Sequence, residues 1–444
     1  GGVRMMAGES GEWRAAQRVV QADGGNRARS LRYWLEQDHG MDLSAITLKN
    51  SPLEGLGMFA ARDLEPGETV FTIPRECTVY PEMVLEDRML GKSMKALASK
   101  AGTGIETVAL ATFLAREKLV GSESSRRAYI EVLPWDSMHP LLWTDAEVDL
   151  LEDTYAYEEI MQFRDQVDTA TELFEPVLNP KGIMNIFQAI DQEKQTPEEF
   201  AFLMRGAFAS VLSRAFDSDL AGGSGESDSR VLVPMLDILN HSPKPSVTFD
   251  ATRTKATSKV PVMTAGGIII KEGEELFSSY GAGKADWLML STYGFLSQDV
   301  SSETVLEASL DPSDPLFSQK AAVLSRMGIA ADGQAFNVRR NDCVEGGKGP
   351  ANLLRFLRLR AETDASNLEA AVESPSAEVE GEARAAACQL ATARLTFLEG
   401  ARVRAREAAA RGEETGVRSA AADQVCSLLS SESSACQALL NLSS

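Results

Sequence analysis

The pattern of apolar and polar positions divides the first 300 residues into two β-rich blocks and a helical stretch between them. Residues 46–49, 58–61 and 69–74 are short runs of β-forming residues, separated by turns that contain Gly and Pro, and they predict strands. From about residue 81 to 216, apolar residues recur at helical spacing. Strands are predicted again at 247–250 and 267–270, and within 271–281 after a turn.

One stretch does not fit a simple apolar strand. Residues 231–242 read VLVPMLDILNHS, an apolar run that ends in turn-forming residues, so they predict a buried strand or a tight helical turn. Asp237, Asn240 and His241 are polar where the chain is expected to be buried, and each needs a partner there. Taken alone, these residues favour a satisfied structural turn over a ligand site.

The domain organisation follows from length and from a change in composition. A chain of 444 residues favours two domains. We expect residues 1–30 to be disordered or processed, because they are polar and lack periodicity. A first domain is expected over 31–298, with a helical insert at about 81–216. Residues 299–444 are rich in Ala, Leu, Glu and Arg and predict a helical second domain.

Charge and the counts of reactive residues exclude several classes of protein. The formal net charge of −21 argues against nucleic acid as a partner and suits basic partners, including protein segments that carry lysine. No apolar run reaches about 18 residues, so no membrane-spanning helix is expected. Five scattered Cys and three His predict no metal site and a reducing compartment. The protein is therefore expected to be intracellular, with cytoplasm or nucleus and plastid undecided.

Several motifs recur in one order along the chain. Gly55 and Gly57 permit close approach of the backbone to a ligand, or a tight hairpin. The wider set is EGLGMFA at 54–60, SRAF at 213–216, PMLDILNHS at 234–242, GEE at 273–275, SYG at 279–281 and YGF at 293–295. Together these motifs resemble the SET-domain protein methyltransferases, and most closely the class of the Rubisco large-subunit lysine methyltransferase. The resemblance covers nearly everything after residue 30.

The resemblance implies an α+β fold: a SET-type β-fold of short sheets with a helical insert, followed by an all-α C-terminal domain that binds substrate. It implies S-adenosylmethionine as the cofactor and methyl transfer to a lysine of a protein substrate by a monomer, without a metal ion. By the same resemblance, the cofactor contacts are Glu54, Gly55, Leu56, Asn240 and His241. Tyr293 is the catalytic tyrosine beside the reacting amine, Tyr280 lines the lysine channel, and Arg214 and Asp237 are substrate-binding residues that flank the substrate and cofactor site.

Two alternatives stay open. The first is a protein-histidine methyltransferase like the actin-directed relative, which lacks a tyrosine at the position of Tyr293. The second is a catalytically silent binding module, because Lys284-Ala285-Asp286-Trp287 stands where the family has an Asn-Ala/Ser-Glu segment. Tyr293, Asn240 and His241 together favour the lysine enzyme.

Overall fold

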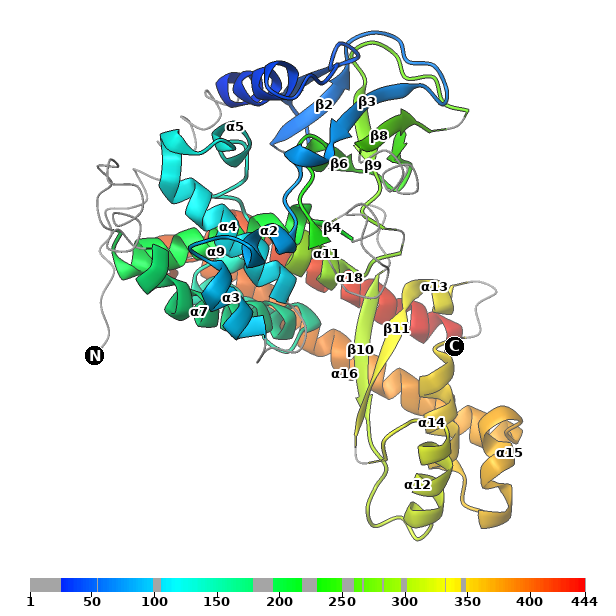
Figure 1. The fold of residues 1–444 in the computed structure, drawn as a ribbon. Coiled ribbons are helices and arrows are strands. Elements are labelled where there is room, and N and C mark those ends of the chain that lie inside the picture. The colour runs from blue at the N-terminus through cyan, green and yellow to red at the C-terminus, as the bar shows by residue number, and fades with distance from the viewer. Residues whose placement is uncertain are drawn as a thin grey trace. The chain divides into compact units, whose positions relative to one another are not determined.

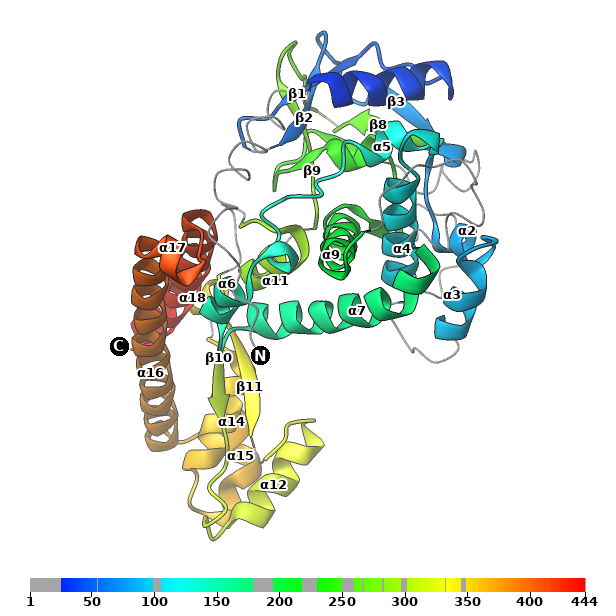
Figure 2. The same ribbon diagram turned by 90° about the vertical axis from the view of Figure 1, so that its left-hand side faces the viewer.

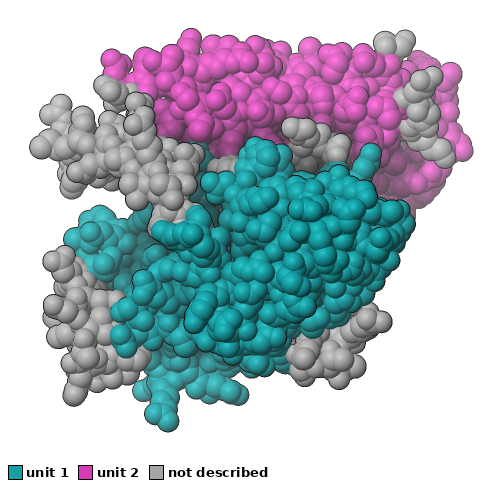
Figure 3. Space-filling model, turned by 90° about the horizontal axis from the view of Figure 1, so that it is seen from above, with its two compact units in different colours: residues 1–142, 158–282, 291–294 teal, residues 143–157, 283–290, 295–444 magenta. Residues whose placement is uncertain are grey.

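The computed structural model describes residues 25–53, 55–98, 105–178, 195–217, 230–249, 259–265, 267–281, 283–296, 302–331, 333–344 and 349–443. The chain divides into two compact units, coloured separately in Figure 3. Unit 1 comprises residues 1–142, 158–282 and 291–294, and unit 2 comprises 143–157, 283–290 and 295–444. Neither unit is one continuous piece of chain, and the predicted boundary at 298/299 stays a prediction.

Short strands form the sheets of unit 1, and the three strands predicted first along the chain are confirmed. The sheet orders in this unit are β1-β2-β9-β6, β3-β8-β7 and β4-β5 (Figure 1). The bounds are β1 Ile46–Asn50, β2 Leu56–Ala60, β3 Thr69–Pro74, β4 Phe216–Asp217, β5 Arg230–Val231, β6 Asn240–His241, β7 Val247–Phe249, β8 Lys259–Thr264 and β9 Glu275–Ser278.

The strand predicted at 267–270 is wrong. Only Ile270 makes a bridge, to Leu64, and Ile268 and Ile269 are exposed. Gly267 has a φ of 81°, so the chain turns there instead of extending. The actual strand, β8, lies earlier and contains Pro261, a residue that argues against a central strand in a sequence.

Helices make up the insert of unit 1 and most of unit 2. Residues 25–37 are helical. The other bounds are α2 Pro81–Leu85, α3 Gly91–Ala98, α4 Ile105–Val120, α5 Arg127–Ile130, α6 Asp145–Val148, α7 Tyr155–Leu178, α9 Pro197–Arg214, α11 Asp286–Tyr293, α12 Phe317–Arg326, α13 Arg340–Cys343, α14 Ala351–Ala361, α15 Leu368–Glu373, α16 Ala377–Ala410, α17 Gly412–Thr415 and α18 Ser419–Ser443.

The first helix corrects the expectation of disorder over residues 1–30. Residues 1–24 lie outside the described residues, but 25–30 belong to the helix. Ala28, Leu31 and Leu35 recur at helical spacing and are buried. The guanidinium of Arg32 donates to the carbonyl of Ile46, in β1, at 2.6 Å and to that of Leu43, in the loop before β1, at 2.9 Å. These two hydrogen bonds hold the helix against the sheet.

The core of unit 1 is built on α4 and α9, which pack against each other (Figure 2). α9 starts at a capping box, in which Thr196 and Glu199 satisfy each other's backbone N–H groups, with Pro197 in the first turn. Its last residue is Arg214. The packing of α9 therefore fixes the position of one residue that was predicted to bind substrate.

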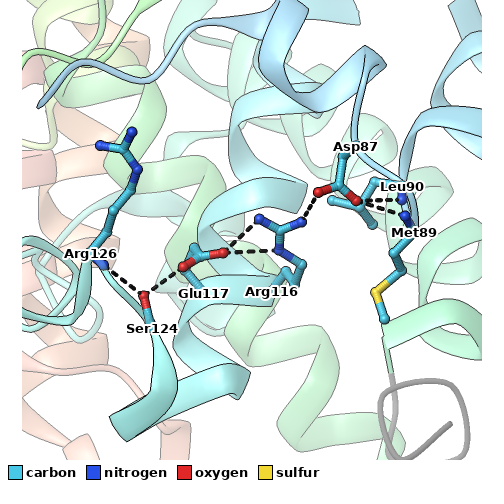
Figure 4. A network of polar contacts seen from close by, with 7 residues as sticks. All are labelled: Asp87, Met89, Leu90, Arg116, Glu117, Ser124 and Arg126. Atoms are coloured by element: carbon cyan, nitrogen blue, oxygen red, sulfur yellow. Dashed lines mark hydrogen bonds and ion pairs between the residues drawn. The ribbon is translucent and has the colours of Figure 1, made fainter. Parts of the chain in front are cut away.

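A chain of polar contacts fixes α5 to the rest of the insert (Figure 4). Arg116 pairs with Asp87 and donates to Glu117 at 2.6 Å. Glu117 accepts from Ser124 at 2.5 Å, and the Ser124 hydroxyl accepts from the backbone of Arg126 at 3.1 Å. Arg126 immediately precedes α5, so this network holds the helix that carries Tyr129.

Unit 2 is mainly helical, as predicted, with α16 and α18 packed along each other (Figure 2). The expectation of an all-helical region misses one antiparallel pair, β10 (Glu303–Ala308) with β11 (Gln334–Arg339). β10 reads ETVLEA and lies in an Ala-, Leu- and Glu-rich segment, a composition that favours helix in a sequence. Pairing of Glu303 with Arg339 at 3.0 Å offsets the burial of that carboxylate.

Candidate active site

Strand β9 brings the predicted cofactor segments together. It pairs antiparallel with β2 through Met58 and Leu276, and parallel with β6 through Asn240 and Phe277 (Figure 1). The turn that precedes β2 and the Asn240-His241 pair therefore lie on either side of one strand. This order places segments that are far apart in the sequence in one sheet.

Glu275, the first residue of β9, links those two segments directly. Its carboxylate accepts from the carboxamide Nδ2 of Asn240 at 2.7 Å and from the Ser51 hydroxyl at 3.0 Å. Gly57 has no room for a side chain, because a Cβ there would lie 2.5 Å from Glu275 Oε1. The resemblance included Glu275 in a motif but assigned it no role, so its position is new information from the structure.

The Gly-rich turn is open to solvent at Gly55. Gly55 is exposed with a φ of 63°, and a Cβ at this position would meet no heavy atom within 4 Å. The backbone N–H of Ser51 donates to the Gly55 carbonyl at 2.8 Å and closes the hairpin, and Leu56 begins β2. Glu54, the remaining predicted contact in this turn, lies outside the described residues.

Two tyrosines and a histidine form one aromatic cluster. The backbone N–H of Tyr280 donates to Nδ1 of His241 at 3.1 Å, and the two rings lie 5.2 Å apart. Tyr293, at the end of α11, stacks on Tyr280 with ring centroids 5.0 Å apart and an interplanar angle of 28°. Its hydroxyl donates to the Tyr280 carbonyl at 3.4 Å. The structure thus brings together three residues predicted from separate motifs.

The phenol of Tyr280 is hydrogen-bonded and neutral. Its hydroxyl donates to the carbonyl of Leu239 at 2.8 Å. Burial raises the pKa of Tyr280 to about 12, so the phenol stays protonated at neutral pH.

Asp237 lies in a buried 3-10 turn, Leu236–Ile238, and faces the interior. Its carboxylate accepts from the Tyr129 hydroxyl at 2.7 Å, and Oδ1 has no hydrogen-bond partner among the described residues. Burial raises the pKa of Asp237 to about 6, and the nearby Arg214 guanidinium and the Tyr129 hydrogen bond oppose that rise. Arg214 itself donates to the Asp237 backbone carbonyl at 2.6 Å.

The turn that holds Asp237 is strained. Met235, which directly precedes this turn, has a φ of 78° although it is not glycine, and its side chain is fully buried. Such a conformation costs on the order of 1–3 kcal/mol and persists only where the surroundings hold it. Within VLVPMLDILNHS, the buried turn Leu236–Ile238 is followed by the short strand β6. The predicted helical turn and the predicted strand are thus both present, each over part of the stretch.

Sequence reasoning missed three further residues of this region: Ser51, Tyr129 and His139. Tyr129 lies 108 residues from Asp237, and no local signal connects the two. His139 is 2% exposed, and its ring lies against the backbone of Thr292, the residue before Tyr293. An isolated histidine in a sequence gives no indication of such a contact.

The segment that departs from the family pattern begins α11. Asp286 is its first residue and is buried in unit 2, where its carboxylate accepts from the Ser431 hydroxyl. Burial raises the pKa of Asp286 to about 6. The departure therefore lies at the opposite end of the helix from Tyr293.

The part of the chain that the structure describes offers neither a metal cluster nor a membrane span. In this part, no group of three or more His, Cys, Asp or Glu side chains is placed to hold a metal ion. Within the same residues, no helix combines the length and the apolar character needed to cross a membrane.

Comparison with known families gives two matches. The SET domain matches residues 55–281, and the Rubisco LSMT substrate-binding domain matches residues 311–431. The first range contains the Gly-rich turn, β6, β9 and Tyr280. The second lies within unit 2.

Relatives and solved structures agree with these matches. The chain is 28% identical to the chloroplastic [fructose-bisphosphate aldolase]-lysine N-methyltransferase of Arabidopsis thaliana, over 75% of this chain and 64% of that protein. It is 24% identical to the chloroplastic ribulose-1,5 bisphosphate carboxylase/oxygenase large subunit N-methyltransferase of Nicotiana tabacum, over 71% of this chain and 60% of that protein. The chain thus spans less than two thirds of the length of either relative.

The fold is shared with a crystal structure of the SET domain of LSMT bound to lysine and AdoHcy. The TM-score is 0.63 at 18% sequence identity, and the match covers 94% of this chain and 91% of that one. The predicted fold class is therefore confirmed. Since the SET domain match extends over slightly more than half of the 444 residues, this protein belongs to the SET domain family.

Proposed function

We propose that this protein transfers the methyl group of S-adenosylmethionine to the side-chain amine of a lysine in a protein substrate. The observation that carries the proposal is the stacked pair of Tyr280 and Tyr293 beside His241 and Asn240. The names of the relatives support it, because both describe N-methyltransferases that act on proteins, and one names lysine as the residue modified.

The residues of the Gly-rich turn and β6 fit a cofactor that carries polar groups. The exposed backbone at Gly55 lets a ligand approach closely, because no side chain fills the space above it. Glu275 fixes the orientation of the Asn240 carboxamide, whose oxygen is then an acceptor for an amino group. We assign Gly55, Leu56, Asn240 and His241 to the cofactor, together with Glu54 on the resemblance alone.

When bound, S-adenosylmethionine would supply a methyl group already activated on a sulfonium centre. The task of the protein is then to present a neutral amine in line with it. A lysine has a reference pKa of about 10.4, so neutralising it at pH 7 costs on the order of 4–5 kcal/mol. An aromatic wall reduces that cost, since it disfavours the charged form and excludes water.

Tyr280 supplies this aromatic wall, and Tyr293 orients the lysine amine. Tyr280 is neutral, and its hydroxyl is engaged by the Leu239 carbonyl, so its ring and not its hydroxyl is assigned to the channel. Tyr293 is assigned as the catalytic residue that orients the amine. Most of the acceleration would come from alignment of the reacting atoms.

Arg214 and Asp237 are assigned to the substrate side, with an indirect role. Arg214 holds the turn through the Asp237 carbonyl, and the Asp237 carboxylate is engaged by Tyr129. These two contacts support an indirect role: Arg214 and Asp237 would hold the wall of the channel near Leu239 in place, and would not contact the substrate themselves.

The test is the identity of the methylated amino acid. The protein is incubated with S-adenosylmethionine labelled in the methyl group and with a cell extract, and the labelled residue is identified by mass spectrometry. Label on lysine is expected. Label on histidine would support the histidine enzyme, and absence of both label and cofactor binding would support the silent module.

A further inference from the structure

His139 occupies a buried position at the end of the helix that carries Tyr293. It immediately precedes the 3-10 turn Pro140–Leu142, which packs on α9 and so has rigid support. Its Nδ1 accepts from the backbone N–H of Leu141 at 3.2 Å, and its Nε2 lies 3.1 Å from the carbonyl oxygen of Thr292. Because Nδ1 is the acceptor, Nε2 carries the proton and donates to Thr292.

The contact satisfies one end of α11. The last carbonyls of a helix have no partner within the helix and need one from elsewhere. Thr292 is the penultimate residue of α11, directly before Tyr293. The imidazole of His139 therefore caps the turn from which the Tyr293 side chain projects.

His139 also restrains the residue after Tyr293. Gly294 has a φ of 80°, and a Cβ at that position would lie 3.0 Å from the Cα of His139 and 3.3 Å from its Cδ2. The backbone on both sides of Tyr293 is thus in contact with one buried side chain. Burial lowers the pKa of His139 to about 4, so the ring is neutral at physiological pH and keeps Nδ1 as an acceptor.

We propose that His139 is a positioning residue for Tyr293, whose contacts with Thr292 and Gly294 set the direction of the tyrosine hydroxyl. The proposal rests on the proposed function, in which Tyr293 orients the lysine amine. Loss of the Thr292 contact would let the last turn of α11 shift and move the Tyr293 ring on Tyr280. A displacement of about 1 Å at a reacting group can cost on the order of 100-fold in rate.

The first experiment is a double-mutant cycle on methyl transfer. His139→Leu removes the donor, whereas His139→Gln keeps an N–H near the position of Nε2. We expect His139→Leu to lower kcat at least about tenfold with the Kd for S-adenosylmethionine within about twofold of the parent, and His139→Gln to recover most of kcat. In the Tyr293→Phe background, His139→Leu should lower kcat by less than about twofold, because its effect passes through Tyr293.

Equal losses in both backgrounds would overturn the proposal, since a merely structural residue lowers kcat whether or not Tyr293 is present. So would a His139→Gln variant that is as slow as His139→Leu although both bind the cofactor like the parent.

The second experiment reads the tyrosine without catalysis. The protein is prepared with fluorotyrosine, and the fluorine NMR signal of Tyr293 is assigned by its absence in Tyr293→Phe. His139→Leu should shift or broaden this signal and leave that of exposed Tyr33 unchanged, and His139→Gln should restore it. An unchanged Tyr293 signal overturns the positioning role. If the parent transfers no methyl group, the proposed function fails, and this spectrum still decides the role of His139.

Discussion

At the scale of single residues, the site depends on a few side chains with fixed neighbours. Asn240 and Ser51 meet on Glu275, and His241, Tyr280 and Tyr293 follow in contact with one another. Most of these contacts join segments that are distant in the sequence. We expect substitutions of single residues to affect cofactor binding and methyl transfer separately.

Removal of the Tyr293 hydroxyl tests the transfer step. In Tyr293→Phe the ring can still stack on Tyr280, but the oriented hydroxyl is lost. We expect kcat to fall at least about 100-fold, with the Kd for S-adenosylmethionine within about twofold of the parent. Steady-state kinetics and calorimetric titration measure the two quantities. Tyr33→Phe, at an exposed tyrosine, is the control, and undiminished turnover in Tyr293→Phe would remove Tyr293 from the mechanism.

Removal of the Asn240 carboxamide tests cofactor binding. Asn240→Ala removes the carboxamide that Glu275 orients, and with it the oxygen assigned as an acceptor for the cofactor. We expect the Kd for S-adenosylmethionine to rise about tenfold or more by calorimetry. Asn352→Ala, at an exposed position on α14, should bind like the parent. Equal affinities of Asn240→Ala and the parent would contradict the assignment.

His139 makes the stability of the protein depend on pH with a known sign. Its pKa is lowered from 6.5 to about 4 in the folded protein. The unfolded chain therefore takes up this proton first, and the contribution to stability is present above pH 6.5 and lost as the pH falls toward 4.

Between pH 7 and pH 5, the parent should lose about 2 kcal/mol more unfolding free energy than His139→Gln. Urea unfolding at the two pH values measures this difference. Equal losses in parent and variant would mean that His139 is not buried in the neutral form.

At the scale of secondary-structure elements, the strands and contacts that could not be predicted from the sequence are those that depend on long-range pairing. Strands at 46–50 and 69–74 were predictable because Gly- and Pro-containing turns bound them. Strand β8 was not predictable, because it contains Pro261, and proline argues against a central strand. Strand β10 was not predictable either, because its composition favours a helix. For the site, a family resemblance proposed Asn240, His241, Tyr280 and Tyr293, whereas the contacts of Glu275 and His139 exist only when β9 and α11 are in place.

In unit 2, segment 143–157 is held to the helical region by an ion pair whose carboxylate is buried. The Glu147 carboxylate is fully buried and accepts from the backbone N–H and the guanidinium of Arg418 at 2.7–2.8 Å, and it also caps α6 through the N–H of Thr144. The Glu147 carboxylate therefore both caps α6 and ties segment 143–157 to Arg418.

Glu147→Gln should destabilise unit 2 by about 2–3 kcal/mol, because it leaves the partly exposed Arg418 guanidinium without its counter-charge. Urea unfolding followed by tryptophan fluorescence is suitable, since Trp143, the first residue of this segment, is buried. Arg326→Gln, which breaks the exposed pair with Glu369, should change stability by less than about 0.5 kcal/mol. Similar effects of the two substitutions would show that the burial of Glu147 does not matter.

At the scale of the whole molecule, the two family matches and the charge support the same kind of partner. The SET domain match holds most of the residues proposed for the chemistry, and the Rubisco LSMT substrate-binding match lies within unit 2. A net charge of −21 favours the approach of a basic, lysine-bearing protein surface. These observations support the proposal that the substrate is a protein.

Methyl transfer to lysine is measured most directly by mass spectrometry of proteins labelled from deuterated S-adenosylmethionine. Parent protein and Tyr33→Phe are incubated with the same extract as Tyr293→Phe, and labelled peptides are sequenced. We predict label on the side-chain amine of lysine with the parent and Tyr33→Phe, and little or none with Tyr293→Phe. Label on histidine with none on lysine would contradict the proposed function, and equal labelling of lysine by all three proteins would contradict the catalytic role of Tyr293.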